Sequence, residues 1–203
     1  MKKLLTILML LAASLPLWAY DLEVDGIYYN KIVSTSTVQV TNYDSQANSN
    51  SYSGTVVIPE TVSVNGVTYK VTSIGAYAFV DCENLTAIEI PGTVTEIGTN
   101  AFLHCYGLSS VTIADGETTL ELANYQAGNW PRGLFFDCPI ETLYLGRDLS
   151  YDINTQEGIT RTPFSQITEL TTLTIGNNVT KIGVDAFVDC SGLTSVIIPN
   201  NSK

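Results

Sequence analysis

Few side chains in this 203-residue chain could do covalent or metal chemistry, and most of them recur in one pattern. The pentapeptide Ala-Phe-Val-Asp-Cys occurs at positions 78–82 and again at positions 186–190, so a cysteine lies beside an acid twice. The only histidine, His104, directly precedes another cysteine. A cysteine with such a neighbour could be a thiol nucleophile, a metal ligand or half of a disulfide.

The placement of the cysteines argues against catalysis. Each lies three residues after a phenylalanine, at one position of a repeated pattern: Cys82, Cys105, Cys138 and Cys190. A catalytic thiol would be unique, whereas a small apolar side chain that recurs at one position suits a packed core. We therefore predict buried free thiols, and the alternative is a single Cys82–Cys105 disulfide, which export would permit.

The histidine occupies a variable position of the same pattern. His104 stands where other copies have Asp81, Asp137 and Asp189, which predicts a surface histidine within a solvated acidic row. With one histidine and no paired carboxylates, the sequence predicts no catalytic residue, no metal site and no cofactor.

The pattern is a repeat of the whole chain segment around each phenylalanine. Five such residues follow one another at spacings of 23, 33, 29 and 23 positions: Phe79, Phe102, Phe135, Phe164 and Phe187. An earlier half-unit, residues 54–62, supplies a strand without the phenylalanine. Repeats of 20–50 residues are typical of a solenoid, in which each unit buries its apolar face against the next.

The same three structural elements are predicted for each repeat unit. The stretch around Ile88 and Ile90 alternates like a strand, with these side chains inward and Glu89 outward. An Ile-Pro pair ends the strand, and a V-x-x-I-G segment predicts a second short extended piece that ends at a glycine turn. The A-F-x-x-C segment has helix-like spacing and predicts a short 3₁₀ or α turn.

The repeat frame L-x-x-I-x-I-P-x-x-V-x-x-I-G-x-x-A-F-x-x-C resembles that of the BspA-like leucine-rich-repeat family of bacterial surface and secreted proteins. The resemblance runs from about Gly54 to Asn200, and the Phe164 unit departs from it with Pro163 and Ile167. It implies a β-rich leucine-rich-repeat solenoid, right-handed, with a parallel β-sheet on the concave side and short 3₁₀/α turns opposite. It also implies a repeat without catalytic residues that serves in adhesion or protein binding.

The sequence divides the chain into three predicted regions. Residues 1–19 have two lysines, an apolar run and a terminal alanine, as a signal peptide does. Residues 20–53 predict an N-terminal β-hairpin cap followed by a polar loop. Residues 54–203 predict the solenoid of about five units plus the leading half-unit, with insertions at 114–133 and 147–163. No closing unit follows the last strand, which predicts end-to-end association or further repeats there.

Charge and export restrict the partners. Without Lys2 and Lys3 of the signal peptide, 7 basic and 20 acidic residues give a net charge of −13. Such a chain is repelled by phosphate backbones, so we predict no nucleic-acid partner, and no membrane insertion after signal cleavage. The predicted location is secreted, periplasmic or at the cell surface.

The candidate binding residues lie on the sheet and in the insertions. The outward column of the strands is predicted to contain Val57, Glu89, Thr112, Tyr144, Thr174 and Ile197. The insertions bring further aromatic and basic residues, because inserted loops often carry function. The candidate ligand-binding residues are Tyr144, Trp130, Tyr125, Arg147, Glu89, Thr112 and Thr174.

We interpret this set as a non-enzymatic binding module for an extracellular or surface protein. The alternative is a glycan-binding accessory module of a carbohydrate-utilising bacterium, because Trp130, Tyr125 and Tyr144 could form a sugar platform. A third interpretation assigns no ligand to Trp130 and Tyr125, which would then pack beneath their own loop.

Overall fold

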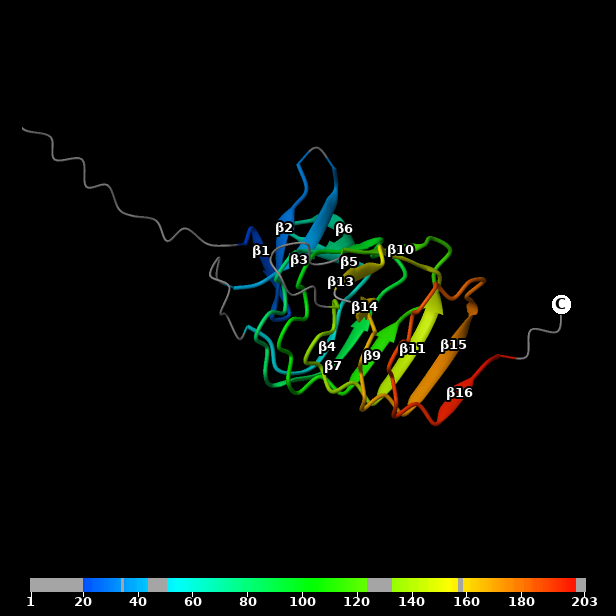
Figure 1. Ribbon diagram of the computed structural model, residues 1–203. Coiled ribbons are helices and arrows are strands. Elements are labelled where there is room, and N and C mark those ends of the chain that lie inside the picture. The colour runs from blue at the N-terminus through cyan, green and yellow to red at the C-terminus, as the bar shows by residue number, and fades with distance from the viewer. Residues whose placement is uncertain (1–19, 34, 44–50, 124–132, 157–158, 200–203) are drawn as a thin grey trace, which may run out of the picture.

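The computed structural model describes residues 20–33, 35–43, 51–123, 133–156 and 159–199. Its main feature is a six-stranded sheet in which all neighbouring strands are parallel (Figure 1). Each strand comes from a successive repeat, as a solenoid requires. From one edge to the other, the strands are β4 (Gly54–Val57), β7 (Leu85–Ile90), β9 (Ser110–Ile113), β11 (Thr142–Arg147), β15 (Thr172–Asn178) and β16 (Ser195–Ile197).

The register of this sheet is set by the repeat frame. Ile88 and Ile90 of β7 are buried and Glu89 is exposed, so alternate side chains enter the core. The same alternation in each strand brings the predicted outward residues opposite one another. The Cα partners across the sheet are Val57, Glu89, Thr112, Tyr144, Thr174 and Ile197, which confirms the predicted column.

A second sheet contains the short extended pieces, and its strands alternate along the chain with those of the first. Four of its strands run parallel to one another: β6 (Val67–Ile74), β8 (Glu96–Ile97), β10 (Leu120–Leu122) and β12 (Leu149–Ser150). Strands β10 and β12 lie inside the segments 114–133 and 147–163 that were predicted to be insertions. The regular repeat therefore continues further into both segments than the sequence indicated.

Antiparallel strands precede the first full coil, as predicted for the N-terminal cap. They are β1 (Leu22–Val24), β2 (Ile27–Lys31) and β3 (Thr37–Thr41), and β3 also pairs with β6. Asp25 and Gly26 between β1 and β2 have positive φ, as do Asn65 and Gly66 between β5 (Thr61–Val64) and β6. Both dipeptides thus form the tight hairpin turns that their sequence predicts.

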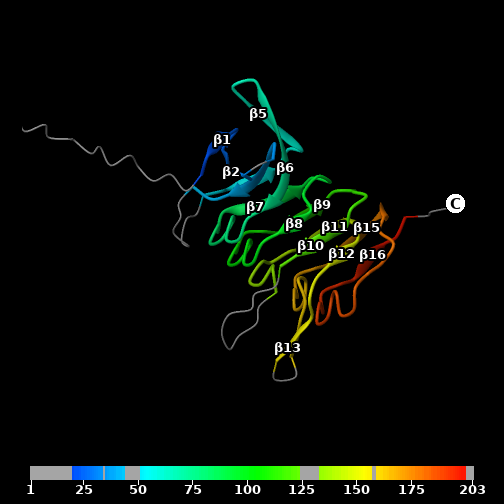
Figure 2. The ribbon, with the colours of Figure 1, turned by 90° about the horizontal axis from the view of Figure 1, so that it is seen from above.

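One further antiparallel pair interrupts the regular stack. Strands β13 (Asn154–Gln156) and β14 (Ile159–Arg161) form a hairpin within the second predicted insertion. The hairpin projects from the body of the stack (Figure 2). This projection is the part of the segment 147–163 that does depart from the repeat.

The prediction of short 3₁₀ or α turns is wrong about helical structure. The A-F-x-x-C segments do turn, but no helix forms among the described residues. The A-F-x-x-C segments are chains of separate turns, in which Val80 N–H donates to Tyr77 O and Cys82 N–H to Phe79 O. Tyr77 and Asp81 have φ of 60° and 55°, in the left-handed region. Because a residue with left-handed φ recurs four positions later, a right-handed helix cannot continue through the segment.

The core contains a column of aromatic rings. Phe102 stacks on Phe79 and on Phe135 with 5.0 Å between ring centroids in both pairs, and Phe164 and Phe187 continue the column. The ring of Tyr52 lies 4.6 Å from that of Phe79 and extends the column beneath the N-terminal strands. The repeated phenylalanines are therefore the core ladder that the sequence predicts.

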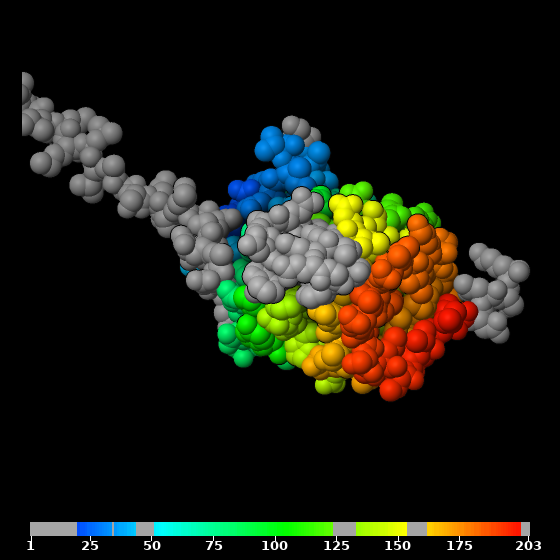
Figure 3. Space-filling model, in the orientation of Figure 1, coloured from blue at the N-terminus to red at the C-terminus, as the bar shows by residue number. Residues whose placement is uncertain are grey.

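The last described coil is less covered than the inner ones. Phe187, Cys190 and Leu193 are only partly buried, whereas their counterparts in the inner coils are enclosed. This coil forms one end of the stack in the space-filling view, in red (Figure 3). Its exposed apolar residues are Ile182, Val184, Val196, Ile197 and Ile198. The end-to-end association expected here stays a prediction.

Candidate functional site

The exposed face of the six-stranded sheet brings together most of the predicted binding residues. Glu89 is exposed, and Thr112, Tyr144 and Thr174 are half-buried in the same row. Adjacent parallel strands lie about 4.8 Å apart, so neighbouring members of the row can contact one ligand together. Tyr125 and Trp130 fall outside the described residues.

Tyr144 is held in place by a residue of the preceding repeat. Its hydroxyl donates a hydrogen bond to Asp115 Oδ1 at 2.9 Å, across 29 positions of sequence. Burial and this carboxylate both raise the pKa of Tyr144, so the phenol stays protonated at neutral pH. The aromatic ring of the row thus has a fixed position and a polar end that is already partnered.

Two glycines make room for this contact. A Cβ on Gly176 would lie 2.5 Å from Asp115 Oδ1 and 2.9 Å from the Tyr144 hydroxyl, and one on Gly146 would lie 2.4 Å from Asp115 N. These distances are shorter than any carbon side chain tolerates. Glycine within β11 and within β15 is therefore what lets the loop after β9 approach the sheet.

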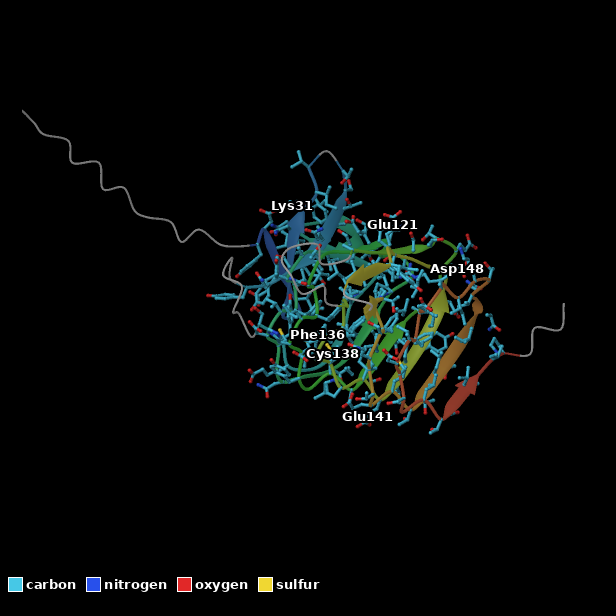
Figure 4. All side chains as sticks on the ribbon, viewed as in Figure 1. Lys31, Glu121, Phe136, Cys138, Glu141 and Asp148 are labelled. Carbon is cyan, nitrogen blue, oxygen red and sulfur yellow. The ribbon has the colours of Figure 1, made fainter. Side chains whose placement is uncertain are left out.

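A polar groove adjoins this contact beyond the carboxyl ends of β11 and β15. It has a volume of about 460 Å³ and is lined by hydroxyl, amide and carboxylate groups of Gly116, Glu117, Thr118, Thr119, Asp148, Asn177, Asn178 and Thr180. Asn178 Nδ2 donates to Gly116 O at 3.3 Å, which joins two repeats across the groove. Asp148 lies just beyond the end of β11 and Glu141 just before its start (Figure 4).

Asp148 of the groove accepts three hydrogen bonds from the segment that follows β15. Its Oδ1 accepts hydrogen bonds from Thr180 N at 2.7 Å and Lys181 N at 2.9 Å, and its Oδ2 accepts one from Thr180 Oγ1 at 2.5 Å. Burial pushes the pKa of Asp148 up, but these hydrogen bonds and the charge of Lys181 outweigh it, so the pKa is lowered overall. The carboxylate is therefore ionised and fixed in position.

Arg147 does not lie on the binding surface, which corrects the sequence prediction. Its side chain is only 1% exposed, and its guanidinium donates to Gly92 O at 2.9 Å and Pro91 O at 3.0 Å. Its Nε has no hydrogen-bond partner among the described residues, and burial lowers the pKa of the guanidinium. Arg147 fastens the third coil to carbonyl groups two repeats earlier and is a structural residue.

His104 bridges the predicted acidic row. Its Nδ1 lies 2.9 Å from Asp81 Oδ1 and its Nε2 lies 3.9 Å from Asp137 Oδ2, while its ring stacks on Tyr106. Asp81, His104 and Asp137 all have φ near 60°, a conformation that aspartate and histidine tolerate better than most residues. The shared backbone conformation explains why aspartate and histidine alternate at this position.

The cysteines form a ladder of hydrogen bonds between coils, and all four are free thiols. Cys105 Sγ donates to Phe79 O at 3.0 Å, Cys138 Sγ to Phe102 O at 3.1 Å and Cys190 Sγ to Phe164 O at 2.9 Å. Burial is the main cause that raises the pKa of Cys82 to about 12. A thiol with so high a pKa is protonated at neutral pH and is a poor nucleophile.

This shift predicts a loss of stability in alkali. The unfolded Cys82 thiol ionises near its ordinary pKa of 9.0 and the folded one near 12, so the stabilisation is complete below pH 9 and falls as the pH rises toward 12. Between pH 7 and pH 10.5, the free energy of unfolding measured in urea should fall by roughly 1–2 kcal/mol less for Cys82→Ala than for the parent. An equal drop in both proteins would contradict the assignment.

Several residues of this surface escaped the sequence analysis. Asp115, Asp148 and Asn178 each follow a predicted strand, which is a detectable signal, because residues after parallel strands gather at one edge of the sheet. The described residues contain no group of three or more histidine, cysteine, aspartate or glutamate side chains that could hold a metal ion. Within the same part of the chain, no helix is long and apolar enough to cross a membrane.

Comparison with known proteins places the fold. The sequence matches the BspA type Leucine rich repeat region, with six copies, over residues 49–130 and 72–203. No curated protein is similar enough in sequence to match the chain. Leucine-rich-repeat regions of this kind are generally non-catalytic binding modules.

Solved structures with the same architecture are bacterial leucine-rich-repeat proteins. A leucine-rich repeat protein from Bacteroides ovatus is 25% identical with a TM-score of 0.50, and the match covers 87% of this chain and 47% of that one. A leucine rich cell surface protein from Faecalibacterium prausnitzii is 25% identical with a TM-score of 0.54, and the match covers 93% and 44%. The chain thus spans less than half the length of these two proteins.

The T. pallidum Leucine Rich Repeat protein shares the fold at 23% identity, with a TM-score of 0.57 and coverage of 87% of this chain and 70% of that one. The repeat frame, the parallel sheet of successive units and the six matched copies agree with one another. The chain therefore belongs to the BspA-type leucine-rich-repeat family.

Proposed function

We propose that the chain is an exported, non-enzymatic binding module that recognises an extracellular or surface protein through the exposed face of its six-stranded sheet. The observation that carries the proposal is the row centred on Tyr144, in which an aromatic side chain stands among small or short polar ones. The winding that we propose is right-handed, as in the family's solenoid, with this sheet on the concave side.

The chemistry of the row favours a protein partner. Tyrosine is enriched at the centre of protein interfaces, where its ring buries a large area at little cost in conformational entropy. Thr112 and Thr174 on either side of Tyr144 leave room for side chains of a partner to contact the ring. A sheet of hydrogen-bonded strands is rigid, so little order has to be gained on binding.

Export is supported by two observations. The first 19 residues have the charge and apolar pattern of a signal peptide, although they lie outside the described residues. One structural neighbour is named a leucine rich cell surface protein. We propose a secreted, periplasmic or cell-surface location for this chain on these grounds.

Glycan binding is the second candidate function, and the polar groove favours it. Sugars are bound by planar arrays of hydroxyl, amide and carboxylate groups beside an aromatic ring. The groove has Asp148, Asn178 and Thr180 in its walls, and Gly116 connects it to Asp115 and so to Tyr144. Its 460 Å³ is within the range of small-ligand sites.

Tyr144→Ala should weaken binding of a protein partner at least tenfold, because the variant removes the aromatic centre of the row. The measurement is surface plasmon resonance against a panel of extracellular-matrix and cell-surface proteins, together with a glycan array. Tyr106→Ala is the matched control, since Tyr106 is an exposed tyrosine on the turns, away from the sheet.

The pattern of losses separates the two functions. Loss of protein binding in Tyr144→Ala alone supports the protein-binding proposal. Binding to the glycan array that Asn178→Ala abolishes would favour the glycan instead. Equal binding by the parent, Tyr144→Ala and Tyr106→Ala would show that the row is not the contact surface.

A further inference from the structure

We propose that a groove along the free edge of strand β4 binds an extended segment of a partner protein, which adds to the six-stranded sheet as a further strand. This site lies at the N-terminal end of the sheet and uses backbone groups, so it is independent of the row centred on Tyr144. The occupant is a peptide segment with apolar side chains and at least one lysine or arginine.

The edge of β4 has hydrogen-bonding groups on its outer side. Gly54 N–H donates to Asn84 O and Ile58 N–H donates to Glu89 O, so the even-numbered residues of this segment pair with β7. In a parallel ladder, the residues between them direct their N–H and C=O away from that neighbour. Thr55 and Val57 therefore present both groups at the free edge, where β4 is the last strand of the sheet.

A groove of about 600 Å³ lies against these groups. Its other wall is the hairpin of β1 and β2, including Val24, Asp25 and Ile27, and Thr61 to Ser63 of β5 complete it. Val56 and Val62 lie in its buried part, whereas Thr55 and Val57 stand at its exposed rim. An added strand of four residues spans about 13 Å, and the apolar and polar side chains of the walls can select its alternate side chains.

A buried tyrosine hydroxyl lies behind the wall of the groove. Tyr29 lines the groove, is 0% exposed, and its hydroxyl has no hydrogen-bond partner among the described residues. A buried polar group without a partner costs free energy, and a native protein rarely keeps one without a use. The neighbouring Tyr52 hydroxyl differs, because it donates to Thr41 O and accepts from Tyr28 N.

Charge identifies the kind of occupant. Asp25 is the one charged residue among those described that line the groove, and the whole chain has a net charge of −11. A second copy of so acidic a chain would be repelled, whereas a segment with a lysine or arginine near Asp25 would be attracted. We therefore assign the groove to a neutral or basic segment of a different protein.

The test begins with a phage-displayed library of random linear 12-residue peptides, selected on the wild-type protein. We expect enriched peptides to alternate apolar residues with polar ones and to contain lysine or arginine. Isothermal titration of a synthetic enriched peptide should give a Kd at least tenfold weaker for Val57→Pro than for wild type. Proline removes the outward N–H of Val57 but none of the hydrogen bonds to β7, as edge strands tolerate.

Two matched variants sharpen the result. Val57→Thr keeps the backbone donor and should bind as wild type does. Asp25→Asn should weaken binding several-fold and reduce its salt dependence, and it keeps the hairpin because Asn-Gly favours the same turn. Tyr144→Ala should leave peptide binding unchanged, so failure of this site and failure of the sheet-face proposal can be told apart.

Methylated peptides keep the test decisive if Val57→Pro is poorly folded. Two peptides are compared, one N-methylated at its odd-numbered residues and the other at its even-numbered residues. One of them should lose binding to the wild-type protein and the other should keep it. Bound peptide should also protect the Thr55 and Val57 amides from hydrogen exchange. The proposal is overturned if no peptide is enriched, or if Val57→Pro or both methylated peptides bind equally well. A wild-type dimer that Val57→Pro abolishes would also overturn it, in favour of a second copy.

Discussion

Phe102→Ala should lower the free energy of unfolding by about 3–5 kcal/mol, the range for a large aromatic residue truncated in a core. Phe102 is fully buried and stacks on rings from both neighbouring coils at 5.0 Å. Neither neighbour can collapse into the space, because each is held by its own strand and turns. The measurement is urea unfolding of parent and variant, followed by circular dichroism.

Two controls test the cause of this loss. Cys105→Ala removes one weak sulfur donor and a small volume from the same turn, and should cost about 1 kcal/mol. Phe187→Ala should cost less than Phe102→Ala, because Phe187 is only partly buried in the last described coil. If Cys105→Ala proved as damaging as Phe102→Ala, the thiol would contribute far more than packing.

Arg147→Ala should cost about 2–4 kcal/mol, which is large for a residue that its sequence would place on a surface. The substitution leaves the Pro91 and Gly92 carbonyls without their guanidinium donors and opens a cavity beneath the loop at Gly116. Arg147→Lys should recover only part of this, because one ammonium cannot match the planar fork that reaches both carbonyls.

The control for Arg147 is Lys181, an exposed cation. Lys181→Ala should change stability by less than about 0.5 kcal/mol, as most exposed substitutions do. Thermal and urea unfolding of the three variants at neutral pH would measure the difference. Equal stability of Arg147→Ala and Lys181→Ala would mean that the buried guanidinium adds nothing to the fold.

The repeat frame is what made the sheet predictable. Because Ile88, Val111 and Leu143 occupy one position of successive units, the register of their strands follows from the alignment alone. The hairpins at Asp25 and Asn65 were also predictable, because a following glycine favours positive φ at both positions. Both predictions depend only on local sequence or on exact repetition.

The parts that were wrong or missed depend on contacts between repeats that the frame does not encode. Arg147 follows a strand and looks like a surface residue, but carbonyls more than 50 positions earlier enclose it. Asp115 reaches Tyr144 only because Gly146 and Gly176 lack side chains. The turns were predicted as helical from spacing alone, and the left-handed residues at Tyr77 and Asp81 prevent that.

The sulfur-to-carbonyl hydrogen bonds all run in one direction along the chain. In each of the three bonds, the thiol belongs to the later coil and the acceptor to the coil synthesised before it. Each of these coils thus offers a carbonyl acceptor to the thiol of a later coil, whereas Tyr77, Phe79 and Asp81 donate their backbone N–H groups to carbonyls of the coil that follows. Neighbouring coils are therefore joined by hydrogen bonds of both directions, so the polar groups of one coil are satisfied only when its neighbour is in place.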